Sequence, residues 1–153
     1  MADPKEWGSL LWKIIHSTCA HLGNNTNAIL QRDELTYFKA FQRKLFYIIP
    51  CKICRTHYKE YMINIKDVKY DEIKEYSTNY YYNLHNKINS SNNKPLFKKE
   101  DLEIYNYSKN EYNNLLTELN ELYSKYIKLR YISFDELNDF NRILRILRNF
   151  INF

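Results

Sequence analysis

Residues that interrupt regular secondary structure are scarce in this chain, which has only 2 glycines and 3 prolines among its 153 residues. Tight β-turns depend on these residues, so a protein made of many hairpins is disfavoured. The sequence also lacks the run of about 18 apolar residues that a membrane-spanning helix needs. No apolar stretch follows the opening segment of residues 1–4, as it would in a signal peptide. We therefore expect a cytoplasmic protein that does not associate with a membrane.

Cysteine is rare, and neither sign of charge dominates. The chain has 3 cysteines, and an odd number with one close pair differs from a secreted disulfide scaffold. Its 23 basic and 18 acidic residues are interspersed and give a formal net charge of +5. A nucleic-acid-binding surface needs its basic residues concentrated on one face, so we expect no nucleic-acid partner.

Helical periodicity is what the chain does contain. Apolar residues make up 44% of it, including 15 tyrosines and 8 phenylalanines, and they recur at spacings of three and four. Asp33 is expected to cap the second helix and Ser133 or Asp135 the last one. Pro50 is expected to end the second helix and to fit the first turn of the third. The expected helices cover residues 7–22, 33–49, 51–61, 71–89, 99–107, 111–131 and 135–150.

This order of helices predicts an all-α fold. Four of the helices, joined by short links, form a four-helix bundle with a short fifth helix, all within residues 1–107. Residues 108–153 form a C-terminal helical extension made of two amphipathic helices. The extension either packs on the bundle or offers a surface for a partner or a second copy of the chain.

The main chemical signal is the pair Cys51 and Cys54, which has two residues between its thiols and directly follows Pro50. Such a pair can close into a disulfide and open again, and so stores two electrons. At the start of a helix, unpaired N–H groups and the helix dipole favour a thiolate. The motif alone also fits half of a zinc site, with His57 and His85 as further ligands. Three ligands on one helical turn, however, fit a tetrahedral site poorly.

Three segments together are more specific than the cysteine pair alone. They are Trp7-Gly8-x-x-x-Trp12-x-x-x-His16, Pro50-Cys51-x-x-Cys54-x-x-His57-Tyr58, and Leu84-His85-Asn86-x-x-Asn89 continuing to Lys94-Pro95-x-Phe97. In this order and spacing, the set resembles the FAD-linked sulfhydryl oxidases of the Erv/ALR family. The resemblance extends from Trp7 to Phe97 and implies the four-helix bundle of that family.

The resemblance also implies a role for each matching residue. Cys54 corresponds to the thiol beside the isoalloxazine ring of FAD, and Cys51 corresponds to the thiol that exchanges with a partner and must be reachable. Lys94 provides a positive charge suited to a phosphate, and Tyr80 stands where the family often has tryptophan. The FAD-binding positions implied by the resemblance are Trp7, Gly8, Trp12, His16, His57, Tyr58, Tyr80, His85, Asn86, Asn89 and Lys94.

The chain also departs from the family pattern, because no cysteine follows Cys54 to act as an internal shuttle. A protein dithiol or a separate thiol relay protein must then reach Cys51 directly, as in the shuttle-less forms of large cytoplasmic DNA viruses. Family members are commonly homodimers, so the resemblance implies a homodimer. Cys19 and His21 match nothing in the family pattern. We expect Cys19 to be buried and inert, with an intermolecular disulfide as the alternative, and His21 to lie at the surface.

The function that the resemblance implies is thiol oxidation: a dithiol reduces the cysteine pair, the pair reduces FAD, and oxygen is converted to hydrogen peroxide. One alternative is a non-enzymatic helical interaction module whose cysteine pair is structural or binds zinc. Another is a thiol carrier that exchanges disulfides without a flavin. A thioredoxin fold is disfavoured, because the segment before Pro50 has helical rather than strand periodicity.

Overall fold

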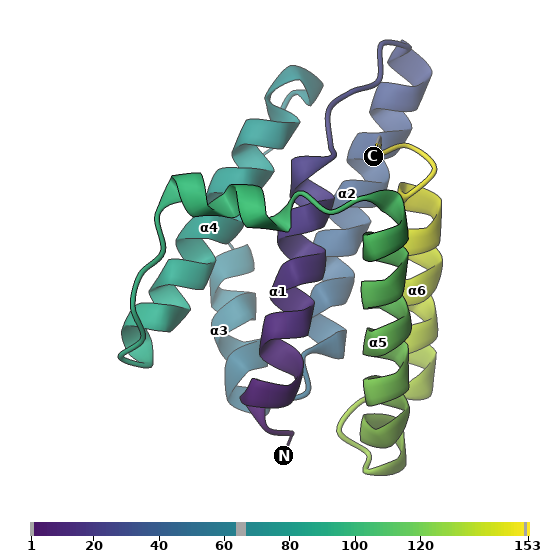
Figure 1. Cartoon of the computed structure of the whole chain (residues 1–153). Helices are drawn as coiled ribbons and strands as arrows, with labels where there is room; N and C mark the ends of the chain where they lie inside the picture. The colour runs from purple at the N-terminus through teal and green to yellow at the C-terminus, as the bar shows by residue number, and fades with distance from the viewer. Residues whose placement is uncertain (1, 64–66, 152) are drawn as a thin grey trace.

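The computed structural model describes residues 2–63, 67–151 and 153, whose regular secondary structure is helical, with no β-strand (Figure 1). The all-α prediction is confirmed. The α-helices are α1 (Pro4–Ala20), α2 (Ala28–Ile48), α3 (Lys52–Met62), α4 (Ile73–Ser91), α5 (Lys109–Lys128) and α6 (Phe134–Leu147), with two 3₁₀ helices, η1 (Tyr70–Glu72) and η2 (Lys99–Tyr105).

Polar side chains define where these helices begin. Asp3 caps α1 by accepting from Lys5 N–H, and Ser133 caps α6 by accepting from Glu136 N–H. The expected start of α2 at Asp33 is wrong, because Asn27 caps the helix and accepts from two backbone N–H groups. Pro50 lies outside α3 rather than in its first turn, since Cys51 is the N-cap residue.

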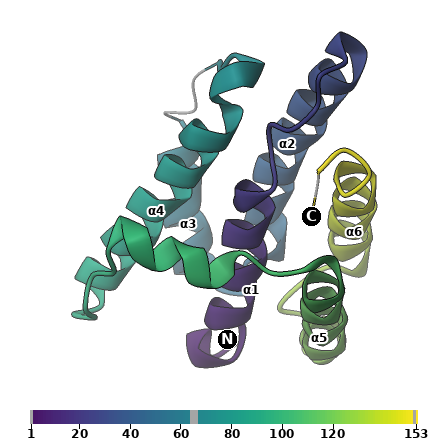
Figure 2. The same ribbon diagram turned by 45° about the horizontal axis from the view of Figure 1, so that its top comes forward.

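Helices α1 to α4 form a bundle, and η2 crosses one of its faces between α4 and α5 (Figure 1). The hairpin of α5 and α6 lies on the side of α1 and α2 that faces away from α3 and α4, and there α5 packs on α1 and α6 packs on α2 (Figure 2). The C-terminal helices therefore pack on the bundle, which was one of the two expectations for them. The bundle face formed by α1 and α2 is covered by the chain's own hairpin.

Buried aromatic residues join the hairpin to the bundle. The rings of Phe41 and Phe140 have centroids 5.9 Å apart, and both side chains are buried. The hydroxyl groups of Thr18 and Tyr112 form a buried hydrogen bond of 2.7 Å between α1 and α5. One hydrophobic cluster includes residues from both parts. The boundary between residues 107 and 108 stays a prediction.

The two residues outside the family pattern are both buried. Cys19 is 1% exposed, as expected, and burial raises the pKa of its thiol to about 12, so it stays protonated at neutral pH. The expectation that His21 lies at the surface is wrong. His21 is buried, donates from Nδ1 to the Ser17 carbonyl at 2.7 Å, and its ring lies 4.4 Å from that of Phe153. Of the helices in the described part of the chain, none has the length and apolar character required to span a membrane.

Candidate functional site

The two thiols of the cysteine pair lie at the N-terminus of α3. Cys51 has an extended backbone and its Sγ accepts from the Cys54 N–H at 3.3 Å, so the sulfur takes the place of a capping oxygen. This hydrogen bond and the positive end of the helix dipole both stabilise negative charge on the Cys51 sulfur. Both cysteines are free in the structure.

The two sulfurs have different surroundings. Cys51 is 4% exposed and belongs to the hydrophobic cluster, so the expectation that the exchange thiol is reachable is wrong for this conformation. Its side chain folds back against the first turn of α3 to accept the hydrogen bond, and this position is inside the core. Cys54 is half-buried, and burial followed by the proximity of Cys51 raises the pKa of its thiol.

A cavity of about 530 Å³ lies beside Cys54. Its volume is within the range of about 300 to 1,000 Å³ typical of small-molecule sites. Helix α1 contributes one continuous face, since Pro4, Gly8 and Leu11 are followed by Trp12 and Ile15 at helical spacing. The remaining lining residues are Lys5, Trp7, Ser9, Leu45, Ile49, Cys54, Tyr58, Tyr81, Leu84, His85, Ile88, Asn89, Asn92, Lys94 and Tyr105.

Stacked aromatic rings form one wall of this cavity. The Trp12 and His85 rings are nearly parallel, with centroids 4.1 Å apart and an interplanar angle of 6°. His16 lies behind them, with its Nε2 3.0 Å from His85 Nδ1 and its ring 4.7 Å from that of Tyr105. Burial, with a smaller effect of His85, lowers the pKa of His16 to about 3. Burial, with a smaller effect of Lys94, lowers the pKa of His85 to about 4, so both rings are neutral at pH 7.

Two buried tyrosines from α3 and α4 also line the cavity. The Tyr58 hydroxyl donates to the Gln42 carbonyl at 2.7 Å and lies 3.0 Å from the Tyr81 hydroxyl. Because the Tyr58 proton is used by the carbonyl, Tyr81 is the donor between the two hydroxyl groups. These bonds connect α3 to α2 and α4 immediately behind Cys54, and they hold the first two turns of α3 in place.

The cavity contains some of the expected FAD-binding residues and leaves others outside. Asn86 lies outside and exchanges two hydrogen bonds with the backbone of Phe97, of 3.0 and 3.1 Å, which hold the segment after α4. Tyr80 packs among Tyr61, Tyr76 and Tyr81. His57 is exposed, and His16 reaches the site only through His85. The expected residues that line the cavity are Trp7, Gly8, Trp12, Cys54, Tyr58, His85, Asn89 and Lys94.

Sequence reasoning did not identify the apolar floor of the cavity or two of its aromatic residues, Tyr81 and Tyr105. Leu45 and Leu84 have the helical spacing of core residues, and periodicity cannot distinguish a side chain that faces a cavity from one that faces another helix. Tyr105 reaches His16 only because η2 folds back across α1. No local signal in the sequence indicates that contact.

The structure does not support a metal centre at the cysteine pair. In residues 2–63, 67–151 and 153, no three His, Cys, Asp or Glu side chains are grouped as metal ligands would be. The zinc set of Cys51, Cys54, His57 and His85 is thus not brought together in the structure.

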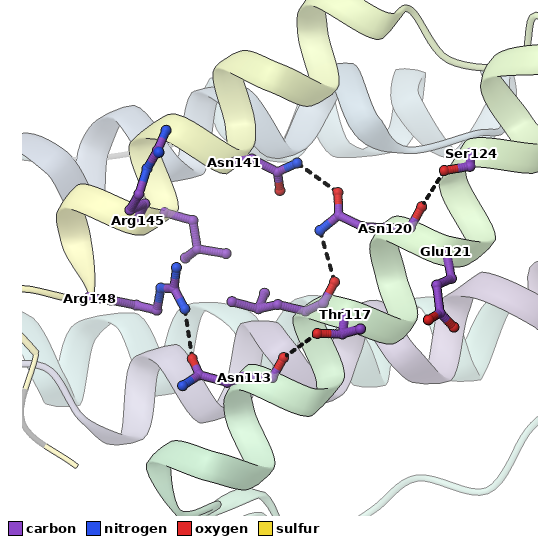
Figure 3. Close-up of a pocket in the computed structure, with 10 residues that line it drawn as sticks. Asn113, Thr117, Asn120, Glu121, Ser124, Asn141, Arg145 and Arg148 are labelled. Atoms are coloured by element: carbon purple, nitrogen blue, oxygen red, sulfur yellow. Dashed lines mark hydrogen bonds between the residues drawn. The ribbon is translucent and has the colours of Figure 1, made fainter.

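A second hollow of about 660 Å³ is formed by α5 and α6 alone (Figure 3). Its polar side chains bond to one another: Asn141 donates to Asn120 at 2.7 Å, and Arg148 donates to Asn113 at 2.6 Å. No thiol lines it. Its hydrogen-bonding groups connect the two helices, and Cys54 lines the first cavity and not this one.

Comparison with known proteins agrees with this geometry. The model of the Erv1/Alr family matches residues 9–113, which is more than half of the chain and runs from within α1 through α4 to the first turn of α5. No curated protein and no solved structure gives a significant match. The family is known for FAD-linked sulfhydryl oxidases, and its fold is helical. The chain belongs to the Erv1/Alr family.

Proposed function

We propose that this protein is an FAD-dependent thiol oxidase that forms disulfides in protein substrates and passes the electrons to oxygen. The observation that carries the proposal is the position of Cys54. One member of a redox-capable pair lines a cavity with aromatic walls, while the other lies at the N-cap of the same helix. A structural cysteine pair would not need a cavity of ligand size beside one of its sulfurs.

The lining of the cavity fits FAD. Trp7 is 7% exposed, and its Nε1 is a buried N–H that finds no acceptor among the described residues, so a ligand carbonyl or ring nitrogen would satisfy it. A Cβ on Gly8 would meet no protein atom within 4 Å, which shows that α1 leaves open space at the middle of its cavity-facing side. The apolar floor and flat rings suit an isoalloxazine and an adenine.

The other residues that line the cavity suit different parts of this cofactor. Lys5 and Lys94 line the cavity and supply two positive charges for the diphosphate. Trp12 and His85 offer a stacked surface for a flat ring, and Asn89 offers a nearby amide. Cys54 lines the cavity together with Tyr58 and Tyr81, and the redox-active ring would lie against these residues.

The cysteine pair can perform the exchange by ordinary thiol chemistry. A partner thiolate attacks Cys51 Sγ of the oxidised pair, the Cys51–Cys54 bond breaks, and Cys54 leaves as a thiolate. The second partner thiolate then attacks the partner sulfur of the mixed disulfide and releases Cys51. The partner loses two electrons and two protons, and the pair gains them.

Cys54 is the member of the pair that can pass the electrons on, because it lines the cavity in which an acceptor would bind. Burial raises the pKa of its thiol, so this thiol must give up its proton before it can react as a thiolate. When bound, FAD supplies the acceptor for these two electrons and transfers them to oxygen, which gives hydrogen peroxide. The protein supplies position, a thiolate and an environment poor in water.

Partners follow from the same proposal. No cysteine follows Cys54, so the electron donor is a protein dithiol substrate or a separate thiol relay protein, as in the shuttle-less viral members of the family. The proposal includes a homodimer. Because α5 and α6 cover α1 and α2, a second copy would have to dock on another face.

The test is a spectrum followed by oxygen uptake. The purified protein should be yellow, with a flavin band near ~450 nm, and should consume oxygen when a dithiol is added. Cys51→Ser and Cys54→Ser should each abolish uptake, because either change prevents the pair from storing two electrons. Cys19→Ala removes a buried thiol outside the cavity and should keep the activity.

Three results would contradict this function. Uptake that persists in Cys51→Ser or Cys54→Ser would remove the assigned roles. A colourless preparation that contains zinc would instead support the interaction module. Disulfide exchange without oxygen consumption would indicate a flavin-free thiol carrier.

A further inference from the structure

The exchange sulfur is inaccessible in this conformation. Cys51 is 4% exposed, whereas attack on a disulfide requires the incoming sulfur to approach the target sulfur directly. The neighbouring residue Ile49 is also buried, at 7% exposed, although it lies in the linker between α2 and α3. The corner that must meet a partner protein is therefore closed, and something must move before exchange.

Arg55 connects this corner to the C-terminal hairpin. Its Nε donates to the Ile49 carbonyl at 2.7 Å, and its terminal guanidinium nitrogen donates to the Tyr131 carbonyl at 3.1 Å. Arg55 is four residues after Cys51, so the two lie on the same side of α3. One side chain thus joins the linker before the cysteine pair, the first turn of α3 and the turn between α5 and α6.

The turn between α5 and α6, residues 129–133, lies at the end of the molecule where α3 begins (Figure 1). Ile132, next to Tyr131, is 5% exposed and belongs to the same hydrophobic cluster as Cys51 and Ile49. Arg130 has a φ of 60°, a left-handed conformation that is unfavourable for a residue with a side chain. The turn thus combines a buried anchor with a strained backbone.

We propose that the α5–α6 turn, fastened by Arg55, is a movable cover over Cys51 that opens before a dithiol partner reaches this sulfur. The cover rests on the proposed oxidase function, which makes Cys51 the exchange thiol. Opening breaks the Arg55–Tyr131 hydrogen bond, withdraws Ile132 and relieves the strain at Arg130. The C-terminal extension therefore regulates access to the redox pair.

The experiment measures how fast each thiol of the reduced, full-length protein reacts with iodoacetamide. Trypsin cleaves after Lys52, which places Cys51 and Cys54 in different peptides, and Cys19 lies in a third. Arg55→Met keeps the length of the side chain but cannot donate, and should accelerate alkylation of Cys51 about tenfold. Lys59→Met, an exposed position on the same helix, should leave the rate within about twofold.

A second variant tests the turn with Arg55 intact. Arg130→Gly removes the left-handed strain, favours the closed turn, and should slow alkylation of Cys51 about threefold. Cys19, 1% exposed, reports global unfolding in the same sample. Acceleration at Cys51 alone in Arg55→Met, together with slowing in Arg130→Gly, supports the cover.

Other results overturn the cover. Equal Cys51 rates in Arg55→Met and the unmodified protein would exclude Arg55 as the fastening residue. Equal acceleration of alkylation at Cys51 and Cys19 would show a general loosening instead of a local opening. An unchanged or higher alkylation rate of Cys51 in Arg130→Gly would show that the turn does not control access to this thiol. The alkylation rates need no flavin, so a failure of the oxidase proposal would appear in the absorbance spectrum and not here.

Discussion

At the scale of single residues, small differences in position give the two thiols of one motif different surroundings. Cys51 is the N-cap of α3 and accepts an N–H, while Cys54, one turn later, faces the cavity. The motif alone predicted a thiol pair at a helix start, and this is confirmed. It could not indicate that Cys51 is buried, because burial depends on residues far away in the chain.

Gly8 provides a test of the cavity that leaves the pair unchanged. Gly8→Leu places a bulky side chain in the open space beside α1 and should weaken FAD binding about tenfold or more, or about 1.4 kcal/mol. Leucine is also a better helix former than glycine, so the helix itself should not be weakened. Flavin content and Kd are measured by absorbance and fluorescence.

The control for this prediction is Gly8→Ala, which adds only a Cβ with no protein atom within 4 Å. It should keep FAD and raise stability by up to about 1 kcal/mol. Unchanged FAD binding in Gly8→Leu would contradict the assignment of this cavity to the cofactor.

His16 and His85 predict how stability depends on pH. Burial lowers their pKa values to about 3 and about 4 in the folded protein, below the usual value near 6.5 for an unfolded chain. The unfolded state then binds more protons, so the free energy of unfolding is highest above about pH 6.5 and falls as the pH drops toward the folded values. Urea unfolding at several pH values measures this dependence.

A double variant, His16→Asn with His85→Asn, should reduce this slope between about pH 6.5 and about pH 4. The matched control is His57→Asn, because His57 is exposed and should leave the slope unchanged. An unaltered slope in the double variant would show that other groups cause the acid sensitivity.

At the scale of helices, the sequence predicted the existence and type of elements better than their limits. The apolar spacing indicated each of the long helices in the structure, because burial of an amphipathic face depends on local periodicity. The start of α2 was placed at Asp33 although Asn27 caps it. Both residue types can cap a helix, and local sequence does not decide between them.

The contact between α2 and α6 predicts a large effect from one core residue. Phe140 is fully buried against Phe41, so Phe140→Ala should lower the free energy of unfolding by about 3 to 5 kcal/mol. Phe134, 61% exposed at the start of α6, is the control. Phe134→Ala should change the free energy of unfolding by less than about 0.5 kcal/mol. Chemical denaturation followed by circular dichroism gives both values.

The outcome at Phe140 also tests whether the hairpin belongs to the cooperative unit. If Phe140→Ala made only α5 and α6 unfold earlier, and the unfolding transition of the rest of the chain stayed unaltered, a shared core would be contradicted. A single transition shifted as a whole would agree with the cluster that joins both parts.

At the scale of the whole molecule, the hairpin limits how copies of this chain can associate. We expect a homodimer by resemblance to the family, through a face other than the one that α5 and α6 cover. Light scattering should give about twice the chain mass of 18.8 kDa. A mass near that of one chain at all concentrations would contradict the dimer.

Local chemistry was readable from the residues alone: scarce glycine and proline disfavoured β-hairpins, periodicity predicted helices, and three short segments indicated the family. Those features depend on neighbours a few positions apart, which are already present in the linear chain. The tertiary fold alone decided which predicted residues face the cavity. In the fold, Tyr105 lies against His16, and His57 and Tyr80 lie outside the cavity. Arg55 joins the α5–α6 turn to the linker beside Cys51. Such contacts arise from the packing of helices distant in sequence, and no local pattern encodes them.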